Sequence, residues 1–345
     1  MWSPEIYNHS MKLLAGIIVA FGSLFLVFYT TVVDFVPTPE SPKIAGVASK
    51  EKAINIIFVG DVMLGRAVEV AYKKEDIFKN VANIFSEADA VVANLEGPIL
   101  SNHIKTPNNS YKFSFATTTL DILKNAGFTD LSLANNHTDN SGRDGYAETV
   151  LNLKSVGLYP FGDPNLMSEY SVSAREIGGK KFIFVGINDT YGNLTTEKIF
   201  GFVKNLREKF KDGILIVCMH WGEEYEFVAN ERQVKIGRGL IDLGTDVVVG
   251  SHPHVVQNTE KYNGRYIFYS LGNFVFDQYF STSTQQGLAV KMKIAEANSE
   301  FELMPVISNR SIPAFMTGEE RASWLKEYLK INKTSQIEII DDILK

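Results

Sequence analysis

Short runs of β-branched and aromatic residues recur along the chain from residue 54 onward, separated by polar segments. These runs predict strands that begin at Ile54, Ala88, Phe128, Lys181, Gly213, Asp246 and Arg265. Between several of them lie amphipathic stretches with helical spacing, at 75–87, 117–126, 144–156, 196–211 and 231–243. Because the strands are continuously apolar rather than alternating, they should be covered on both faces. The pattern therefore predicts a layered α/β fold.

The N-terminal part of the chain has a different pattern. Residues 13–33 read LLAGIIVAFGSLFLVFYTTVV and contain no charged residue. A helix of about 21 residues spans the ~30 Å hydrocarbon layer of a bilayer, whereas the apolar core of a secretory signal has only about 7–15 residues. We therefore expect an N-terminal tail over 1–12 and a retained transmembrane anchor over 13–36. A cleaved signal and a buried core helix are the alternatives, and the few flanking lysines leave the orientation open.

The remaining chain divides into a linker, a domain and an extension. Residues 37–52 combine three prolines with small and charged residues and have no apolar period, which is typical of a partly extended linker. The globular domain is expected to occupy residues 53–310. A C-terminal helical extension, 311–345, includes the segment SWLKEYLKI from Ser323, whose spacing predicts a helix.

Composition narrows the function classes. The chain has 34 Lys and Arg against 40 Asp and Glu, a net charge of -6. This is the wrong balance for a protein that neutralises phosphate backbones, so nucleic acid is not expected as a partner. Hydrophobic residues make up 45% of the chain, which excludes a disordered protein. The single cysteine, Cys218, cannot form an internal disulfide or a thiolate zinc cluster, so any metal would be held by His, Asn and carboxylates.

Side chains that can bind metals follow five of the predicted strands. They supply carboxylate, amide and imidazole groups: Asp61, Glu96, Asn136, His137, His220, His252 and His254. In open α/β sheets, ligands bind beyond the carboxyl ends of the strands, so these side chains should converge on one crevice. A single histidine at a strand end is more often structural. Five such strand ends together favour a metal site.

Six ordered motifs at these strand ends resemble the CapA family of poly-γ-glutamate capsule synthesis proteins. They read GDVMLGR (60–66), NLEGPI (94–99), LANNHTDNSGRDG (133–145), HWGEEY (220–225), GSHPHVVQ (250–257) and SLGNFVFDQ (270–278). That family is similar to the calcineurin-like metallophosphoesterases. The resemblance, which covers roughly residues 54–290, implies a four-layer αββα sandwich of the metallophosphoesterase type. Two mixed β-sheets would pack face to face with helices outside, and two divalent metal ions would lie at one edge.

The resemblance also implies which residues bind each ion. Asp61 and His254 would bind the first ion, and Glu96 would bridge the two. The second ion would be completed by three further residues: Asn136, His220 and His252. Mixed nitrogen and oxygen ligands of this kind suit Mn, Zn or Fe, and the sequence leaves the identity of the metal open.

One motif departs from the phosphoesterase pattern Gly-Asp-x-His. Here it reads Gly60-Asp61-Val62-Met63, so the first ion loses an imidazole and keeps three expected ligands. We therefore expect the first site to be weak, and hydrolytic activity is an open question. Because Met is usual at this position in the CapA resemblance, the departure is a family trait.

Three residues are candidates for catalysis. His137 matches the histidine that protonates a leaving group or steadies phosphoryl oxygens in the resemblance. Arg66 could clamp a carboxylate or phosphate, although a surface salt bridge would explain it equally well. Glu224 could accept a proton or orient a histidine ring, but a solvated acid beside core residues is an equally good explanation.

Two classes of function follow from these motifs. The resemblance implies an accessory protein of a membrane machine that makes or exports poly-γ-glutamate, with a pocket for the carboxylates of that polymer or of another anionic envelope substrate. The alternative is a metal-dependent phosphoesterase or other hydrolase that acts on a different cell-envelope substrate, and a metal-free scaffold is a third. We expect membrane-embedded synthesis partners. The expected location is the cell membrane, with a single span and the globular domain outside the cytoplasm.

Overall fold

The computed structural model describes residues 52–295, 298–332, 339–340 and 343–344. The expected tail and membrane anchor, and all but the last residue of the expected linker, lie outside the described residues. Within these ranges, no helix has both the length and the apolar character to cross a membrane.

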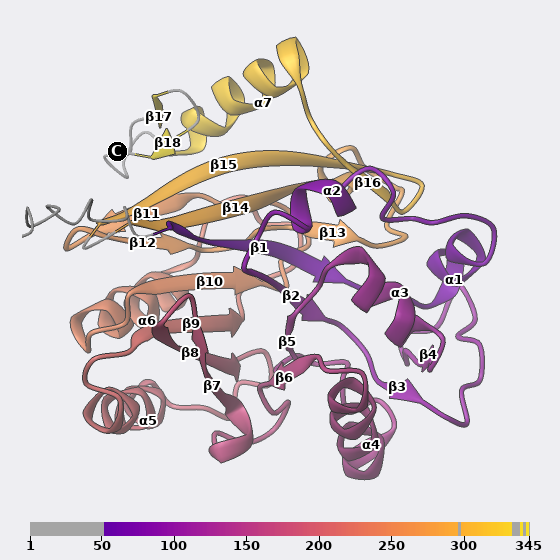
Figure 1. The fold of residues 1–345 in the computed structure, drawn as a ribbon, viewed down its shortest axis with the longest axis horizontal. Helices are drawn as coiled ribbons and strands as arrows, with labels where there is room; N and C mark the ends of the chain where they lie inside the picture. The colour runs from indigo at the N-terminus through magenta and orange to yellow at the C-terminus, as the bar shows by residue number, and fades with distance from the viewer. Residues whose placement is uncertain (1–51, 296–297, 333–338, 341–342, 345) are drawn as a thin grey trace, which may run out of the picture. The chain divides into compact units, whose positions relative to one another are not determined.

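The larger sheet has ten strands and mixes parallel with antiparallel neighbours (Figure 1). Its order is β17-β18-β15-β14-β1-β2-β5-β6, with β13 beside β1 and β16 beside β15. The strands span Ile54–Val62 (β1), Ala90–Leu95 (β2), Asp130–Ser132 (β5), Tyr159–Phe161 (β6), Asn273–Val275 (β13), Gln286–Ala295 (β14), Asn298–Asn309 (β15), Ile312–Phe315 (β16), Ile339–Ile340 (β17) and Ile343–Leu344 (β18). Because β1, β2, β5 and β6 run parallel, their carboxyl ends lie at one edge of the sheet.

The smaller sheet has six strands in the order β11-β12-β10-β9-β8-β7. They span Val172–Ile177 (β7), Lys180–Asn188 (β8), Ile214–His220 (β9), Val247–Ser251 (β10), Thr259–Tyr262 (β11) and Arg265–Phe268 (β12). The four strands β8, β9, β10 and β12 run parallel. A separate pair, β3 (Ile99–Leu100) and β4 (Phe115–Ala116), forms a small third sheet.

A shared apolar core joins the two large sheets face to face. Phe58 of β1 packs in it together with Phe184 of β8 and Val249 of β10. The neighbouring residues Ile57 and Val59 of β1 belong instead to the core on the outer face of the larger sheet. β1 is thus buried on both faces, as its continuous apolar run predicted.

Helices cover the outer faces of both sheets (Figure 1). The larger sheet is covered by α1 (Arg66–Tyr72), α2 (Ala82–Phe85), α3 (Thr119–Ala126) and α4 (Gly142–Ser155), and the smaller by α5 (Thr196–Lys209) and α6 (Glu231–Asp242). One-turn 3-10 helices occur at Glu169–Ser171 and Ser283–Gln285. The expected combination of mixed β-sheets with packed helices is confirmed.

The sequence pattern predicted the elements before residue 270 better than those after it. Each expected strand is present, as β1, β2, β5, β8, β9, β10 and β12. The expected helix over 75–87 is wrong for most of its length, because only Ala82–Phe85 is helical. The Phe78 backbone N–H donates to Asp76 Oδ1 at 2.9 Å, and such a local turn competes with helix formation. The pattern did not reveal α1 or the long antiparallel pair of β14 and β15.

The C-terminal part of the chain contains strands as well as the expected helix. After β16, α7 (Gly318–Ile331) occupies the predicted helical segment. Leu325 and Tyr328 of α7 pack on the core between the two sheets. The Tyr328 hydroxyl lies 2.5 Å from Thr259 Oγ1 of β11, which ties α7 to the edge of the smaller sheet.

Candidate metal centre

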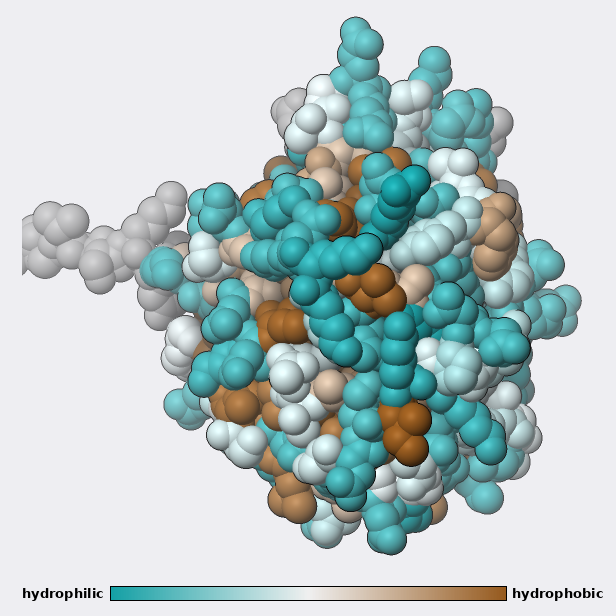
Figure 2. All heavy atoms as spheres, turned by 90° about the vertical axis from the view of Figure 1, so that its right-hand side faces the viewer, coloured by the Kyte–Doolittle hydropathy of each residue, from teal (hydrophilic) through white to brown (hydrophobic). Residues whose placement is uncertain are grey.

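The carboxyl ends of β1, β2, β9 and β10 bring the predicted metal ligands together. In Figure 1 the arrowheads of β1, β9 and β10 point to the right, toward the side that faces the viewer in Figure 2, where apolar side chains form small patches among hydrophilic ones. Strand register explains the convergence, because Asp61 on β1 lies beside Asn94 on β2, and Ser251 on β10 lies beside His220 on β9. The following ligand-type side chains are at least nine-tenths buried: Asp61, Glu96, His220, His252 and His254.

The first group consists of Asp61, Glu96 and His254, whose ligand atoms all lie within 4.8 Å of one another. His254 Nδ1 lies 3.3 Å from Asp61 Oδ2, and its Nε2 lies 3.8 Å from Glu96 Oε1. Asn273 Oδ1 is 3.0 Å from the same Nδ1. An oxygen acceptor on Nδ1 fixes the proton there and leaves Nε2 as the nitrogen available to a metal.

The second group consists of Asn136, His220 and His252. His220 Nε2 lies 2.9 Å from Asn136 Oδ1, while its Nδ1 lies 2.9 Å from Ser251 Oγ. The rings of His220 and His252 have centroids 4.8 Å apart. A carbonyl oxygen and an imidazole nitrogen are thus in direct contact, with a second imidazole beside them; that the three residues bind the second ion stays a prediction.

Two buried atoms in this cluster have no hydrogen-bond partner within the described part of the chain: Glu96 Oε1 and His252 Nδ1. Leaving a buried polar atom unpaired costs about 1–3 kcal/mol, and more for a charged group. A cation would supply the missing partner for both atoms, because each is a metal-ligand type. The residues present therefore fit a centre that binds divalent metal ions.

Burial and neighbouring charges shift the protonation of these groups, and the shifts at His220 and His252 suit metal binding. Burial, and then the charge of Asp61, raise the pKa of Glu96 well above its ordinary value. Burial lowers the pKa of His252 to about 4 and that of His220 well below its usual range, so both are neutral and able to bind a metal. At His254, burial opposes protonation, but the carboxylates of Glu96 and Asp61 outweigh it and raise the pKa to about 9.

Two asparagines that sequence reasoning missed organise the ligands. Asn94 Nδ2 donates to Asp61 Oδ1 at 2.8 Å and to Glu96 Oε2 at 3.2 Å. Asn135 in turn donates to Asn94 Oδ1 at 3.0 Å, and its own Oδ1 accepts the backbone N–H of His137. Asn94 precedes Glu96 by two residues, and side chains two apart on a strand share a face. This spacing was the available signal.

The backbone at the ligands is tightly constrained. His252 and His254 both adopt left-handed conformations, with φ of 99° and 59°, which non-glycine residues rarely adopt outside constrained sites. Gly60 and Gly250 precede ligand-bearing residues, and a Cβ at either would overlap a carbonyl oxygen, that of Gly272 or Tyr269. The ligands are therefore held where two backbones touch directly.

Arg66 is engaged inside the protein. Its side chain is 9% exposed and pairs with Asp277, whose other oxygen accepts the Ala67 N–H at 3.1 Å. The guanidinium also lies over the rings of Phe113 and Phe276, 5.0 and 5.6 Å from their centroids. The salt bridge considered from the sequence is present but buried, and a substrate-clamping role for Arg66 remains a prediction.

His137 lies at the rim of the centre. Its Nδ1 is 3.2 Å from Asn140 Oδ1, and its Nε2 is 3.8 Å from Glu96 Oε1. Its ring packs against Phe113 with centroids 4.3 Å apart. Burial lowers the pKa of His137 below its ordinary value. This position suits a side chain that transfers a proton at the edge of a metal site.

Met63 is part of the apolar core rather than an exposed neighbour of the ligands. Its side chain is fully buried in the cluster beneath α1 and α3, and its sulfur accepts the Gly65 N–H at 3.0 Å. Glu224, in contrast, is exposed and lies with its carboxylate close to His252 and His254; the three ligand atoms are within 4.8 Å of one another.

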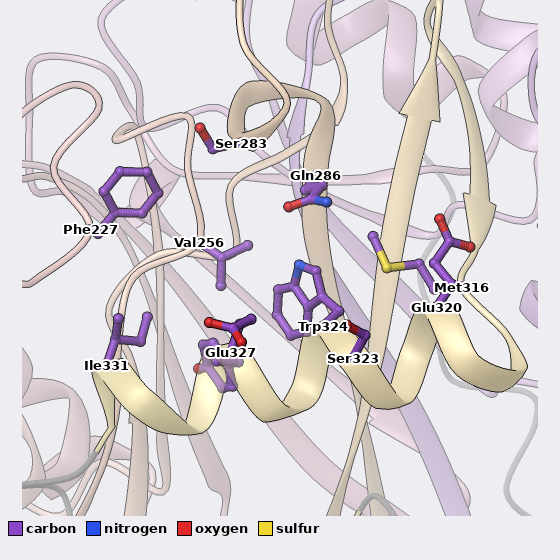
Figure 3. Close-up of a pocket in the computed structure, with 11 residues that line it drawn as sticks. Phe227, Val256, Ser283, Gln286, Met316, Glu320, Ser323, Trp324, Glu327 and Ile331 are labelled. Carbon is purple, nitrogen blue, oxygen red and sulfur yellow. The ribbon is translucent and has the colours of Figure 1, made fainter.

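An apolar groove of about 440 Å³ lies along α7 (Figure 3). The indole of Trp324 and the side chains of Phe227 and Ile331 line it, together with the acids Glu320 and Glu327. Among the described residues that line it, none is cationic. The groove therefore has the wrong charge for a polyanion.

Comparison with known proteins identifies the family of this chain. The sequence pattern of the bacterial capsule synthesis protein PGA_cap matches residues 55–278, which include every proposed metal ligand. The chain belongs to the PGA_cap family. The resemblance inferred from the six motifs is confirmed.

Individual relatives support this family assignment. The chain is 31% identical over 297 residues to the PGA biosynthesis protein CapA of Bacillus subtilis, covering 80% of this chain and 76% of that protein. It is 32% identical over 263 residues to the capsule biosynthesis protein CapA of Bacillus anthracis, covering 69% and 64% of the two chains. A probable polyglutamine synthesis accessory protein of Mycobacterium tuberculosis is 26% identical over 42% of this chain and 44% of its own length.

Proposed function

We propose that this PGA_cap protein takes part in poly-γ-glutamate capsule synthesis or export, using a dinuclear metal centre of the metallophosphoesterase type. The observation that supports the centre most strongly is the pair of buried, unpartnered ligand atoms, Glu96 Oε1 and His252 Nδ1. The name of the Bacillus subtilis relative points to the polymer, and that of the Bacillus anthracis relative points to the capsule.

The chain's own residues would divide the work of such a centre. Asp61, Glu96 and His254 would hold the first ion, and the second would be held by Asn136, His220 and His252 with Glu96 between them. Divalent ions bound here would neutralise substrate anions and lower the pKa of a bound water. The carboxylates of a polyanion would then meet positive charge at this edge of the sheets, whereas Glu320 and Glu327 would repel them from the groove along α7.

A decisive experiment replaces the second-ion ligands in cells. A strain lacking its own copy of the gene is complemented with the full-length protein carrying His220→Ala, His252→Ala or His103→Ala. His103 is the matched control, because it is a partly buried histidine paired with Glu69 and Ser114. We expect surface poly-γ-glutamate and bound metal to fall together in the first two variants and to persist in the third. Normal polymer with full metal content in the His220→Ala protein would contradict the proposal.

A hydrolase acting on another cell-envelope substrate is the second candidate, favoured by the position of His137. Its imidazole lies at the rim and is oriented by Asn140 and Phe113. If the reaction is hydrolytic, His137→Gln should reduce turnover of an activated phosphodiester about 100-fold or more and leave metal content unchanged. Equal turnover in both proteins would argue against this candidate.

We also propose that residues 13–36 anchor the protein in the cell membrane with a single span, and that the globular domain lies outside the cytoplasm. The support is the uncharged apolar run of residues 13–33, which is longer than the core of a secretory signal. After cell fractionation, the intact chain should stay with membranes through a high-salt wash. A soluble form that begins near residue 30–49 would show that the segment is cleaved.

A further inference from the structure

Glu224 lies beside two histidines of the proposed metal centre, where one of the two ions has few protein ligands. In the proposed site, the second ion has Asn136, His220, His252 and the bridging Glu96, whereas the first has only three protein ligands because Met63 stands in place of a histidine. Met63 lies in the apolar core, and its sulfur accepts a backbone N–H. Any fourth protein ligand must therefore come from another part of the chain.

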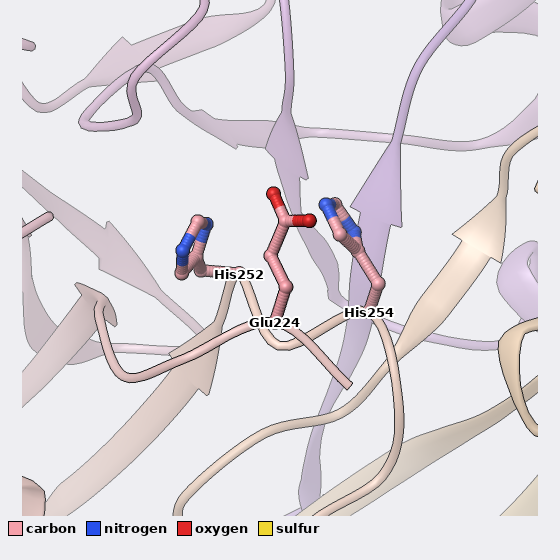
Figure 4. Close-up of side chains that lie close together, drawn as sticks. All are labelled: Glu224, His252 and His254. Carbon is pink, nitrogen blue, oxygen red and sulfur yellow. The ribbon is translucent and has the colours of Figure 1, made fainter. Parts of the chain in front are cut away.

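The carboxylate of Glu224 faces the two histidines that serve the two ions. Figure 4 shows it between the imidazoles of His252 and His254, on the side away from their backbone. One oxygen of Glu224 and one nitrogen of each histidine lie within 4.8 Å of one another. His254 belongs also to the group with Asp61 and Glu96, so the two candidate groups share one imidazole.

The loop that holds Glu224 is fixed against the histidine loop. The Tyr225 N–H donates to the carbonyl oxygen of Pro253, at 2.8 Å, and Pro253 lies between the two histidines. Tyr225 adopts a left-handed conformation, φ 68°, which turns the chain back immediately after Glu224. On the other side, Gln257 Nε2 donates to the Glu226 carbonyl oxygen at 2.9 Å. These contacts hold Glu224 over the centre, although its side chain is exposed.

From this arrangement we propose that Glu224 is a protein ligand of the first ion and replaces the imidazole that Met63 cannot provide. The inference rests on the metal centre in the proposed function. Two independent observations point to a bound metal ion at this position. The buried atoms Glu96 Oε1 and His252 Nδ1 have no hydrogen-bond partner among the described residues, and the exposed carboxylate of Glu224 lies close to His252 and His254. The proposed ion would then have buried ligands on one side and the exposed Glu224 carboxylate on the other.

The ligand set also determines which metal the first site prefers. With Glu224, the first ion has three carboxylates, from Asp61, Glu96 and Glu224, and one imidazole, from His254. The second has two imidazoles and an amide oxygen besides Glu96. Carboxylate oxygens suit Mn²⁺, whereas imidazoles suit Zn²⁺ and Fe. On this proposal the first site is a carboxylate-rich site suited to hard divalent cations such as Mn²⁺ rather than a defective copy of the second.

The test measures Mn²⁺ binding by the full-length protein, purified in a mild detergent, with isothermal titration calorimetry and the electron paramagnetic resonance signal of paired Mn²⁺ ions. Glu224→Ala and Glu224→Gln are compared with Glu223→Ala and Glu223→Gln, which remove the same charge one residue away in the same exposed loop. We expect wild type and both Glu223 variants to bind two Mn²⁺ ions with the coupled signal. Both Glu224 variants should lose the coupled signal and bind the first ion at least about tenfold more weakly.

The alternative outcomes separate this inference from the proposed function. Two ions of wild-type affinity in the Glu224 variants would overturn the inference and leave the metal centre intact, and lower polymer production with full metal content would do so too. Equal losses of Mn²⁺ binding in the Glu223 and Glu224 variants would also overturn it, because the losses would then come from the changed charge of the loop and not from a missing ligand. If wild type binds no Mn²⁺, Zn²⁺ or Fe²⁺, the proposed centre itself fails. Circular dichroism of each variant serves as the control for folding.

Discussion

Glu96 and Asp130 are both fully buried carboxylates on the larger sheet, yet they are stabilised in different ways. Asp130, at the start of β5, receives two hydrogen bonds from Arg175, at 2.9 and 2.5 Å, and one from Thr129. Glu96, just beyond the end of β2, has one oxygen that accepts no hydrogen bond from the described residues; the His254 and His137 rings lie 3.8 Å from that oxygen, and the nearby Asp61 repels it. Burial raises the pKa of both carboxyl groups, but Arg175 opposes this only at Asp130.

The difference teaches how to distinguish a structural acid from a functional one. A buried carboxylate that the chain itself neutralises contributes to the fold. A buried carboxyl group with one oxygen that accepts no hydrogen bond, close to a second acid, is instead a candidate for binding a cation. We therefore expect changes at Asp130 to affect stability whether or not metal is present, and changes at Glu96 to have opposite effects with and without it.

The largest effect is expected at Asp130. Asp130→Ala removes the carboxylate that pairs with the Arg175 guanidinium, and the Arg175 side chain is only 17% exposed. Breaking such a buried pair costs about 3–5 kcal/mol of unfolding free energy, measurable by urea denaturation. Asp121→Ala, which removes an exposed acid from α3, should change stability by less than about 0.5 kcal/mol. A loss below about 1 kcal/mol at Asp130 would erase the contrast between the two acids.

The next effect is the stabilisation gained from metal. At a free Mn²⁺ concentration of about 100 times its dissociation constant, wild type should gain about 2.7 kcal/mol of unfolding free energy. Glu96→Gln should lose nearly all of that gain, because the bridging charge is gone, whereas Asp130→Asn should keep it. Thermal denaturation with and without chelator gives both numbers. An equal gain in the Glu96→Gln protein would remove Glu96 from the centre.

A smaller effect of opposite sign is expected without metal. In chelator, Glu96→Gln should be more stable than wild type by about 1 kcal/mol, because the amide avoids the cost of ionising a buried carboxyl group beside Asp61. The matched change Asp130→Asn should be destabilising under the same conditions. Stability that falls in both proteins would mean that the fold itself satisfies Glu96.

The last prediction concerns pH and is read as a change in trend rather than as a single stability difference. In the metal-free protein, the pKa of His254 is about 9, above the ~6.5 of an unfolded histidine. Its contribution to stability is therefore fully present below pH ~6.5 and is lost as the pH rises through about 9. The difference in melting temperature between wild type and His254→Gln in chelator should shrink over that window. The affinity for Mn²⁺ should rise over the same window, because the metal needs the neutral imidazole. An affinity that falls together with the melting-temperature difference would contradict the assignment of His254 as a metal ligand.

The sequence predicted the chemistry of the site better than its supporting contacts. Each ligand-bearing strand was visible because an apolar run ended in a polar group, and parallel strands bring such ends together. The pairing of Asp130 with Arg175 joins residues 45 positions apart, and no local pattern specifies a partner at that distance. β14 and β15 were not predicted, although they pair in regular register, for example at Met292 and Phe301. Their apolar residues alternate with polar ones over part of their length, so they contain no continuous apolar run like those of the predicted strands.

The glycines before the ligands limit how this protein can change over evolutionary time. Because a side chain at Gly60 or Gly250 would overlap the backbone of a neighbouring segment, substitutions there would displace the ligand-bearing strand ends in one step. The loops around Glu224 and Gln278 are exposed or half-buried and can vary one residue at a time. A lineage that acquires a new polymer or a new metal would therefore change these loops and keep the strand framework. In a saturation mutagenesis library of the domain, substitutions should be tolerated in these loops and not at Gly60 or Gly250.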